Sequence, residues 1–348
     1  MHTTPVALVG LGSYLPPQRI TNAALCERLD TTDEWITSRT GIRSRHWAGP
    51  GVATGDLAVE AGHRALKSAG LEAGAGAVDL VVLATTTPDN PCPATAPDVA
   101  SRLGLGPVAA YDIAAVCSGF LYALAAASAY IAAGQARRAL VIGAETYSTI
   151  LNPSDRTTNV IFGDGAGAVV LSAASDHDDH DDHDNHDRAG LLLGFELGSD
   201  GSGRDLITIP GGGSRQRATT PTPDADDRYF TMQGKHVFTQ AVNRMTESSQ
   251  AVLDRLGWTA EQVDWLVGHQ ANVRILNAVA RGLGIPAERA VINLDKVGNT
   301  SAASIPLALA DAAANGSLTP GSRVLLTAFG GGLTWGAAAL TWPDIVPA

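Results

Sequence analysis

Asp112-Ile113-Ala114-Ala115-Val116-Cys117-Ser118-Gly119-Phe120 joins two stretches of different character. The mostly apolar residues 109–113 predict a short β-strand, and the alanine-rich residues 119–133 predict a long buried helix. A strand that runs directly into a helix is the repeating unit of α/β folds, in which helices cover the faces of a sheet. This stretch therefore predicts an α/β fold with a cysteine where strand meets helix.

The same alternation of strand and helix continues along the rest of the chain. Apolar runs that stop at glycine or proline indicate strands, and runs with a 3.6-residue period indicate helices. Further strands are predicted at residues 6–10, 78–84, 139–144, 166–172, 191–197, 263–268 and 324–328, and helices at 22–29, from Thr32 onward, 53–69, 234–256, 273–283 and 302–314. We therefore expect two similar α/β halves, residues 1–175 and 190–348.

Residues 176–187 interrupt this pattern, because they consist almost only of aspartate and histidine. Imidazole and carboxylate groups can bind a transition metal, but this run has no apolar anchor that would fix a coordination geometry. We therefore favour a solvated loop, residues 176–189, between the two halves.

This run holds seven of the acidic residues of the chain. Without them the chain has 24 basic and 28 acidic side chains, which is a net charge of −4 rather than −11. Nucleic acid is not an expected partner of so mildly acidic a body.

Composition points to a globular cytoplasmic protein. Of the 348 residues, 45% are hydrophobic and 17% are charged, which suits a sizeable core. We expect no membrane span, because no apolar run of about 20 residues is uninterrupted, and no secretory signal, because residues 1–4 carry no basic segment. The three cysteines, Cys26, Cys92 and Cys117, cannot all pair and form no C-x-x-C motif, so neither a disulfide framework nor a structural zinc site is expected.

Cys117 is the candidate nucleophile because it precedes the predicted helix. The positive end of a helix dipole and its unpaired N–H groups favour the thiolate, which is the reactive form. The small neighbours Ser118 and Gly119 allow a substrate to approach closely. A buried structural cysteine is the commoner fate of a free thiol, and position alone leaves that alternative open.

His269 and Asn299 are the other candidates for chemistry. His269 follows a predicted strand, at the end of the sheet where α/β sites form, although a histidine there is as often structural. Asn299 lies among small residues before a predicted helix, where asparagine usually serves as a cap or turn residue and can also donate to an oxyanion.

Two glycine-rich runs also allow two interpretations. The run 330–332 can expose N–H groups to an oxyanion or form a plain tight turn. The run 163–167 precedes a β-rich segment and lacks the lysine of a phosphate loop, so we expect close packing there.

Taken together, these segments resemble the β-ketoacyl-acyl carrier protein synthase III family of the thiolase-like superfamily. Each motif is weak alone, and their joint order along most of the chain is specific. The matching segments are residues 32–36, 38–43, 162–167, 206–212, 269–272, 298–304 and 329–332.

The resemblance implies a thiolase-like fold with layers α/β/α/β/α and a two-step reaction. Cys117 would attack an acyl-CoA and become acylated. Malonyl-acyl carrier protein would then lose carbon dioxide while His269 and Asn299 hydrogen-bond its thioester oxygen, and the carbanion would attack the acyl group. The backbone N–H groups of Cys117 and Gly331 would form the oxyanion hole. No metal or redox cofactor is implied, and the product would initiate fatty acid or polyketide biosynthesis.

The resemblance also implies binding residues and a homodimer. Trp35 would stack on the adenine of CoA, with Arg39 and Arg156 at its polar end. The remaining assignments are Phe162 and Phe238 in the substrate tunnel, Asn272 at the CoA site, Cys92 in the acyl pocket, and Gln270, Ala271, Asn272, Val273, Arg274 and Arg281 at the carrier-protein contact.

Three other functions remain as alternatives. A related acyltransferase would move the acyl group to a non-malonyl acceptor, and the presence of His269 and Asn299 favours condensation over it. A non-catalytic carrier-binding protein would not need the three groups. Thiolase proper would need a second cysteine near the C-terminus, and Cys117 is the last cysteine.

Overall fold

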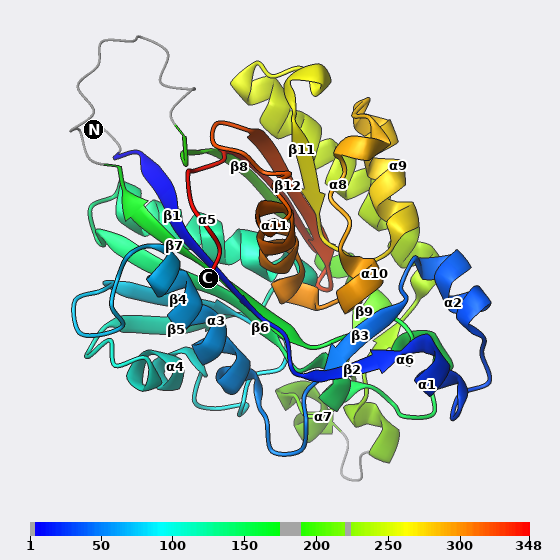
Figure 1. Cartoon of the computed structure of the whole chain (residues 1–348). Coiled ribbons are helices and arrows are strands. Elements are labelled where there is room, and N and C mark those ends of the chain that lie inside the picture. Colours follow the sequence, from blue (N-terminus) through cyan, green and yellow to red (C-terminus); the bar gives the residue numbers. More distant parts are fainter. Residues whose placement is uncertain (1–3, 175–188, 220–223) are drawn as a thin grey trace.

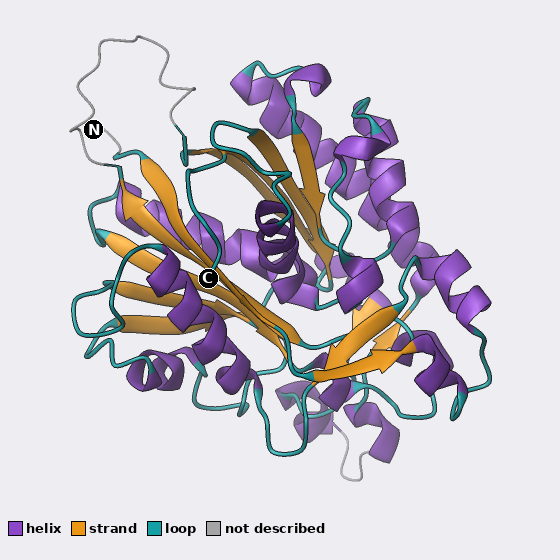
Figure 2. Ribbon diagram, viewed as in Figure 1, coloured by secondary structure: helices purple, strands orange, loops and turns teal. Residues whose placement is uncertain are grey.

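Two β-sheets with helices between and outside them form the core of the chain (Figure 1 and Figure 2). The computed structural model describes residues 4–174, 189–219 and 224–348. The Asp/His-rich run of residues 176–187 lies outside the described residues. Within them, no helix combines the length and apolar character that crossing a membrane would require.

The first sheet has the strand order β1-β7-β6-β4-β5. Strand β4 pairs in parallel with β5 and β6, whereas β7 is antiparallel to both β6 and β1. The strands are β1 (Val6–Tyr14), β4 (Leu80–Ala84), β5 (Ala109–Ile113), β6 (Arg138–Glu145) and β7 (Gly165–Ala173). β5 is an edge strand, with β4 as its only neighbour in this sheet.

The second sheet repeats this arrangement in the order β11-β12-β13-β8, with one parallel pair followed by two antiparallel pairs. Its strands are β8 (Leu192–Ser199), β11 (Trp265–Gly268), β12 (Arg323–Gly330) and β13 (Thr334–Thr341). The strand predicted at residues 324–328 is present as part of β12, but β13 follows it where no strand is predicted. The glycine run is the turn of a hairpin, and small residues such as Ala337 and Ala338 give β13 little strand signal.

Two helices, α5 (Gly119–Ala132) and α11 (Ser304–Ala314), lie between the sheets. Helices that are apolar on most sides are buried, and residues such as Phe120, Leu124 and Ile305 pack in one core cluster with strands of both sheets. α3 (Thr54–Ser68) and α4 (Ala96–Arg102) cover the outer face of the first sheet, and α8 (Gly234–Leu256) and α9 (Val273–Leu283) cover that of the second. The predicted α/β/α/β/α layering is confirmed.

Shorter elements surround one end of the two sheets. They are β2 (Gln18–Thr21), α1 (Asn22–Cys26), α2 (Asp33–Thr40), β3 (Ser44–Trp47), α6 (Arg156–Asn159), β9 (Ile207–Thr208), α7 (Ser214–Thr219), β10 (Thr231–Met232) and α10 (Leu294–Val297). α1 is shorter than the predicted helix over residues 22–29. The division into halves 1–175 and 190–348 stays a prediction, which the separation of the two sheets along the sequence supports.

Glycine in β1 lets α3 pack directly on the first sheet. A Cβ atom added at Gly12 would overlap the backbone of Ala61 and Ala65 in α3. We expect Gly12→Ala to lower the free energy of unfolding by about 1–3 kcal/mol, because a well-packed core resists added volume. Gly49→Ala is the matched control, since a Cβ there would meet nothing within 4 Å. Equal urea midpoints for the two variants would contradict this packing.

Candidate active site

Cys117 lies in a tight turn, η1 (Val116–Ser118), between β5 and α5. The backbone φ of Val116 is 47°, a left-handed conformation that is rare for a β-branched residue and is typical of strained functional turns. The Ser118 hydroxyl contacts both Ala115 O, at 2.8 Å, and Thr334 Oγ1, at 2.7 Å. The turn is therefore held against the β12–β13 hairpin of the second sheet.

The Cys117 thiol is in its protonated form in the free protein. Burial, with a smaller contribution from the Glu145 carboxyl group, raises the pKa of Cys117 to about 12. The prediction that the helix dipole would favour a thiolate is therefore wrong for the free protein. α5 begins two residues after Cys117, and removal of the thiol from water outweighs the dipole.

His269 follows β11 directly and is buried and neutral. Its backbone N–H donates to Thr327 O at 2.8 Å, and its Nδ1 lies 2.6 Å from Ser304 Oγ. Burial lowers the pKa of His269 to about 3. The contact with Ser304 fixes the ring and leaves Nε2 as the nitrogen available to a ligand.

Asn299 is held by its backbone so that its amide group is available. Its N–H donates to Ile161 O and its carbonyl accepts from Gly163 N–H, both at 2.9 Å. Its Oδ1 accepts from Ser301 N–H, also at 2.9 Å. Among the hydrogen bonds of the described residues, none uses Asn299 Nδ2.

One narrow cavity of about 40 Å³ brings Cys117, His269 and Asn299 together. Most of the other lining is apolar, which suits an acyl chain. The other lining residues are Phe162, Ile207, Phe230, Met232, Val237, Ala241, Met245, Ala271, Ile275 and Phe329. The predicted Phe162 is among them. Phe238 is not; it is half-buried, and the Arg274 guanidinium lies 5.9 Å from the centre of its ring.

The glycine hairpin after β12 lies directly against the cysteine turn. A Cβ atom added at Gly330 would lie 2.8 Å from Cys117 N, and one at Gly331 would lie 3.2 Å from Val116 Cγ2. Only glycine permits this approach at residue 330, so the main chain of the hairpin lies against the backbone of Cys117. The predicted close packing of the other glycine run is also present, since Gly167 meets Pro306.

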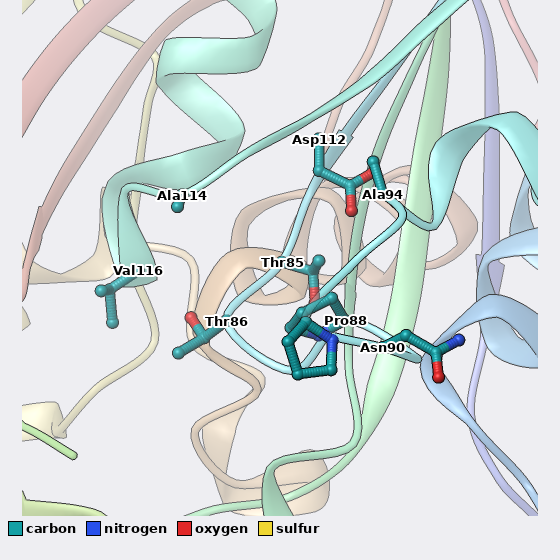
Figure 3. A pocket seen from close by; sticks show the side chains of 9 residues that line it. Thr85, Thr86, Pro88, Asn90, Ala94, Asp112, Ala114 and Val116 are labelled. Carbon is teal, nitrogen blue, oxygen red and sulfur yellow. The ribbon is translucent and has the colours of Figure 1, made fainter. Parts of the chain in front are cut away.

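A second, wider cavity lies beside Ala114 and Val116, just before the cysteine, as Figure 3 shows. It measures about 420 Å³, and Thr86, Asp112 and Val116 are among its lining residues. Cys92 lies in the loop beside it, is exposed, and lines neither this cavity nor the one around Cys117. The role of Cys92 in the acyl pocket therefore stays a prediction, which no cavity lining of the single chain supports.

Trp35, Arg39 and Arg156 of the predicted CoA site form one cluster, in which the two arginines are exposed and Trp35 is half-buried. Thr32 caps α2 by accepting a hydrogen bond from Trp35 N–H at 3.1 Å. The guanidinium carbons of Arg39 and Arg156 lie 6.0 and 5.4 Å from the centre of the Trp35 ring. Arg156 also donates to the carbonyl of Asp30 at 2.6 Å.

The segment predicted to contact a carrier protein divides into buried and accessible residues. Gln270 is completely buried, with its amide bonded to Gly268 O, Val291 O and Asn293 N–H, so it offers no surface to a partner. Asn272 caps α9 and donates to Arg39 O at 3.0 Å, which ties α9 to α2. Ala271, Asn272 and Val273 are half-buried, and Arg274 and Arg281 are exposed.

Known proteins share both the sequence and the structure of this chain. Residues 111–201 match the family model of 3-oxoacyl-[acyl-carrier-protein] synthase III, and residues 253–342 match the model of its C-terminal part. The chain is 65% identical to β-ketoacyl-[acyl-carrier-protein] synthase III 5 of Streptomyces coelicolor, over 97% of each protein. It is 51% identical to β-ketoacyl-[acyl-carrier-protein] synthase III of Pseudomonas aeruginosa, also over 97% of each. The chain belongs to the β-ketoacyl-[acyl-carrier-protein] synthase III family.

Solved structures agree with this membership. The crystal structure of the Pseudomonas aeruginosa synthase III superposes with a TM-score of 0.89 at 50% identity, covering 99% of this chain and 100% of that one. The priming β-ketosynthase from the R1128 polyketide pathway superposes with a TM-score of 0.88 at 32% identity, covering 100% and 98%. The predicted family and thiolase-like fold are confirmed.

Sequence reasoning missed two polar supports of this synthase III site. Ser304 orients His269 from 35 residues away, and Thr334 anchors the cysteine turn through Ser118 from 216 residues away. Both are small hydroxyl residues in apolar segments. The neighbouring sequence is the same whether such a hydroxyl group only fills space in the core or bonds to a catalytic side chain.

Burial of neutral His269 predicts a specific acid sensitivity. The unfolded chain binds a proton at this residue below about pH 6.5, whereas the folded chain does not until about pH 3. Stability is therefore fully present above pH 6.5 and is lost as the pH falls, by about 2 kcal/mol at pH 5. We expect His269→Gln to remove this component of the pH dependence in urea titrations at pH 7.5 and 5. The exposed His236→Gln serves as control, and an unchanged pH dependence in His269→Gln would contradict the assignment.

Proposed function

We propose that this chain condenses an acyl-CoA with malonyl-acyl carrier protein through an acyl-Cys117 intermediate. The observation that carries the proposal is the single cavity that Cys117, His269 and Asn299 line in a chain of the synthase III family. The product is a β-ketoacyl-acyl carrier protein, which initiates fatty acid or polyketide biosynthesis. The chemistry needs no metal or redox cofactor.

In the first half-reaction the Cys117 sulfur attacks the thioester carbonyl of the acyl-CoA. The carbonyl oxygen becomes an oxyanion, which the N–H groups of Cys117 and Gly331 stabilise. The close approach of the glycine hairpin to the cysteine turn supports this pairing of donors. CoA leaves as a thiolate, and the acyl chain occupies the apolar cavity.

In the second half-reaction His269 and Asn299 stabilise the enolate of the decarboxylating malonyl thioester. We assign the hydrogen of the Ser304 hydroxyl to His269 Nδ1, 2.6 Å away, while the Ser304 oxygen accepts from Gln270 N–H at 3.4 Å. The proton of neutral His269 then lies on Nε2, which donates to the thioester oxygen together with Asn299 Nδ2. The carbanion attacks the acyl group and Cys117 is released.

Two surfaces support binding of the substrates. The Trp35 indole offers a stacking face for adenine, and Arg39 and Arg156 provide charge beside it. Arg274 and Arg281 on α9 provide positive charge for an acidic carrier protein, next to the accessible faces of Ala271, Asn272 and Val273. Gln270 is left out of this contact because it is buried.

We also propose a homodimer. The edge strand β5 has an unpaired side within the described residues, and a second copy can pair with such an edge. Cys92 then reaches an acyl pocket only if its loop extends into the cavity of the partner subunit. Sedimentation velocity measures the oligomeric state directly.

Mass spectrometry of the intact chain tests the proposed reaction. Incubation with acyl-CoAs of several lengths should add one acyl group to the wild-type protein, and malonyl-acyl carrier protein should then remove it with release of carbon dioxide. Cys117→Ser should lose nearly all acylation. Acylation that is discharged to an acceptor other than the malonyl thioester would favour the transferase function instead.

The two half-reactions should separate in variants of the other two groups. We expect His269→Ala and Asn299→Ala to acylate Cys117 at close to the wild-type rate, because neither group acts in the first step. Loss of one enolate donor should slow malonyl decarboxylation by about 100-fold or more. Release of labelled carbon dioxide from malonyl-acyl carrier protein measures this step. Normal condensation by either variant would refute its assigned role.

A further inference from the structure

Glu145, the last residue of β6, is a buried carboxyl group that the reaction above leaves without a role. It is completely buried. It accepts hydrogen bonds from Thr86 N–H at 3.0 and 3.1 Å, Thr87 Oγ1 at 2.9 Å and Ala302 N–H at 3.4 Å. These donors fix the carboxyl group, and no lysine or arginine is among its described partners. Burial raises the pKa of Glu145 to about 7, so it exchanges a proton near neutral pH.

Ser301 connects Glu145 to the nucleophile. It begins the short turn η7 (Ser301–Ala303), and its φ of 48° is in the left-handed region. Its Oγ is buried without a hydrogen-bond partner of ordinary length among the described residues. The turn η7 packs against both η1, which carries Cys117, and β6, and its next residue donates from Ala302 N–H to the Glu145 carboxyl group at 3.4 Å. In this position the Ser301 hydroxyl lowers the pKa of both Cys117 and Glu145. A strained backbone that holds an unpartnered hydroxyl beside two titratable groups indicates a functional position.

Cys117 and Glu145 compete for one proton. The Glu145 charge raises the pKa of the thiol, so ionising both groups in this dry environment is unfavourable. Two groups coupled in this way titrate as a pair. Tyr147 is the other titratable group that faces them; its buried hydroxyl has no partner among the described residues, and both groups raise its pKa. Above about pH 7 the pair therefore carries one proton, on the thiol, and one negative charge, on Glu145.

We propose that Glu145 holds the proton of Cys117 during the catalytic cycle, receiving it through the hydroxyl of Ser301. This inference rests on the acyl-cysteine reaction proposed above. It assigns a proton acceptor to the first half-reaction, where neither His269 nor the backbone donors provide one.

Every proton and electron pair that moves in the first half-reaction is accounted for by the end of the second. As the sulfur–carbon bond forms, the thiol proton passes to Ser301 Oγ, and the Ser301 hydroxyl proton passes to Glu145. The bond between the acyl carbon and the CoA sulfur breaks, and CoA leaves with that electron pair and takes a proton from solvent. When the malonyl carbanion attacks acyl-Cys117, the cysteine sulfur leaves as a thiolate. Glu145 returns its proton to this thiolate along the same route.

The pH profile of acylation in Glu145→Gln tests the proposal. Acetylation of Cys117 by acetyl-CoA is followed by quenched flow and intact mass between pH 5.5 and 9. The wild-type rate should rise through a transition near pH 7 to a plateau, since the acceptor must be deprotonated. Glu145→Gln should be slower by about 100-fold and should lack this transition.

Two results would overturn the proposal. If Glu145 were only a negative neighbour, its removal would lower the pKa of the thiol, and the variant would acylate faster than wild type. If Glu145 were only structural, a slower variant would keep the transition near pH 7. Asp164→Asn is the matched control, because Asp164 is also a buried carboxyl group, bonded to Ala48 N–H and Ser148, and its loss should leave the transition in place.

A second variant and a second reagent keep the test decisive. If Glu145→Gln fails to fold, Ser301→Ala should show the same slow acylation with the carboxyl group present, and a wild-type rate there would overturn the relay. If the wild-type protein accepts no acyl-CoA, the proposed function fails instead. Alkylation of Cys117 by iodoacetamide then measures the same proton exchange, with a plateau above about pH 7 in wild type that Glu145→Gln should lack.

Discussion

The packing of α5 and α11 between the two sheets is the constraint on which the site depends. The segments before these two helices meet at the ends of β4 and β6. The backbones pack so closely there that only glycine fits. A Cβ atom at Gly143 would overlap the backbone of Ala302, and one at Gly119 would lie 3.1 Å from Ala84 Cβ and 3.6 Å from Ala302 Cβ. The turns that carry Cys117 and Asn299 immediately precede these contacts, so their positions follow from core packing.

The same packing explains the chemistry of the site, because it removes the titratable groups from water. Burial favours the neutral form of each group: it raises the pKa of the Cys117 thiol and lowers that of His269. The site therefore presents oriented hydrogen-bond donors at neutral pH rather than a preformed ion pair. Such donors stabilise charge that develops during the reaction, with little reorganisation. A buried thiol also needs a proton acceptor when it reacts. Glu145 is a buried carboxyl group whose charge acts on the pKa of Cys117.

Local signals in the sequence predicted an α/β fold and candidate groups for chemistry, whereas the five layers and the joint role of the three groups followed from the family resemblance. Apolar runs that end in glycine mark the strands, and Cys117, His269 and Asn299 each stand where one element ends and another begins. Burial and distant partners leave no such signal. The motif around Gln270 does not reveal whether its side chain faces solvent or the core. The fold shows that it faces the core. Glu145 ends an ordinary strand, and its proximity to Ser301 arises from a contact across 156 residues.

The central claim is that acyl-Cys117 is an intermediate that goes on to condense, and a pulse–chase measurement tests it most directly. The protein is acylated with a carbon-14-labelled acyl-CoA, separated from free CoA esters, and then mixed with unlabelled malonyl-acyl carrier protein. The account predicts that the label moves from the protein to β-ketoacyl-acyl carrier protein, with one carbon dioxide released for each acyl group transferred. Label that stays on the protein, or that appears only as free acid, would contradict it.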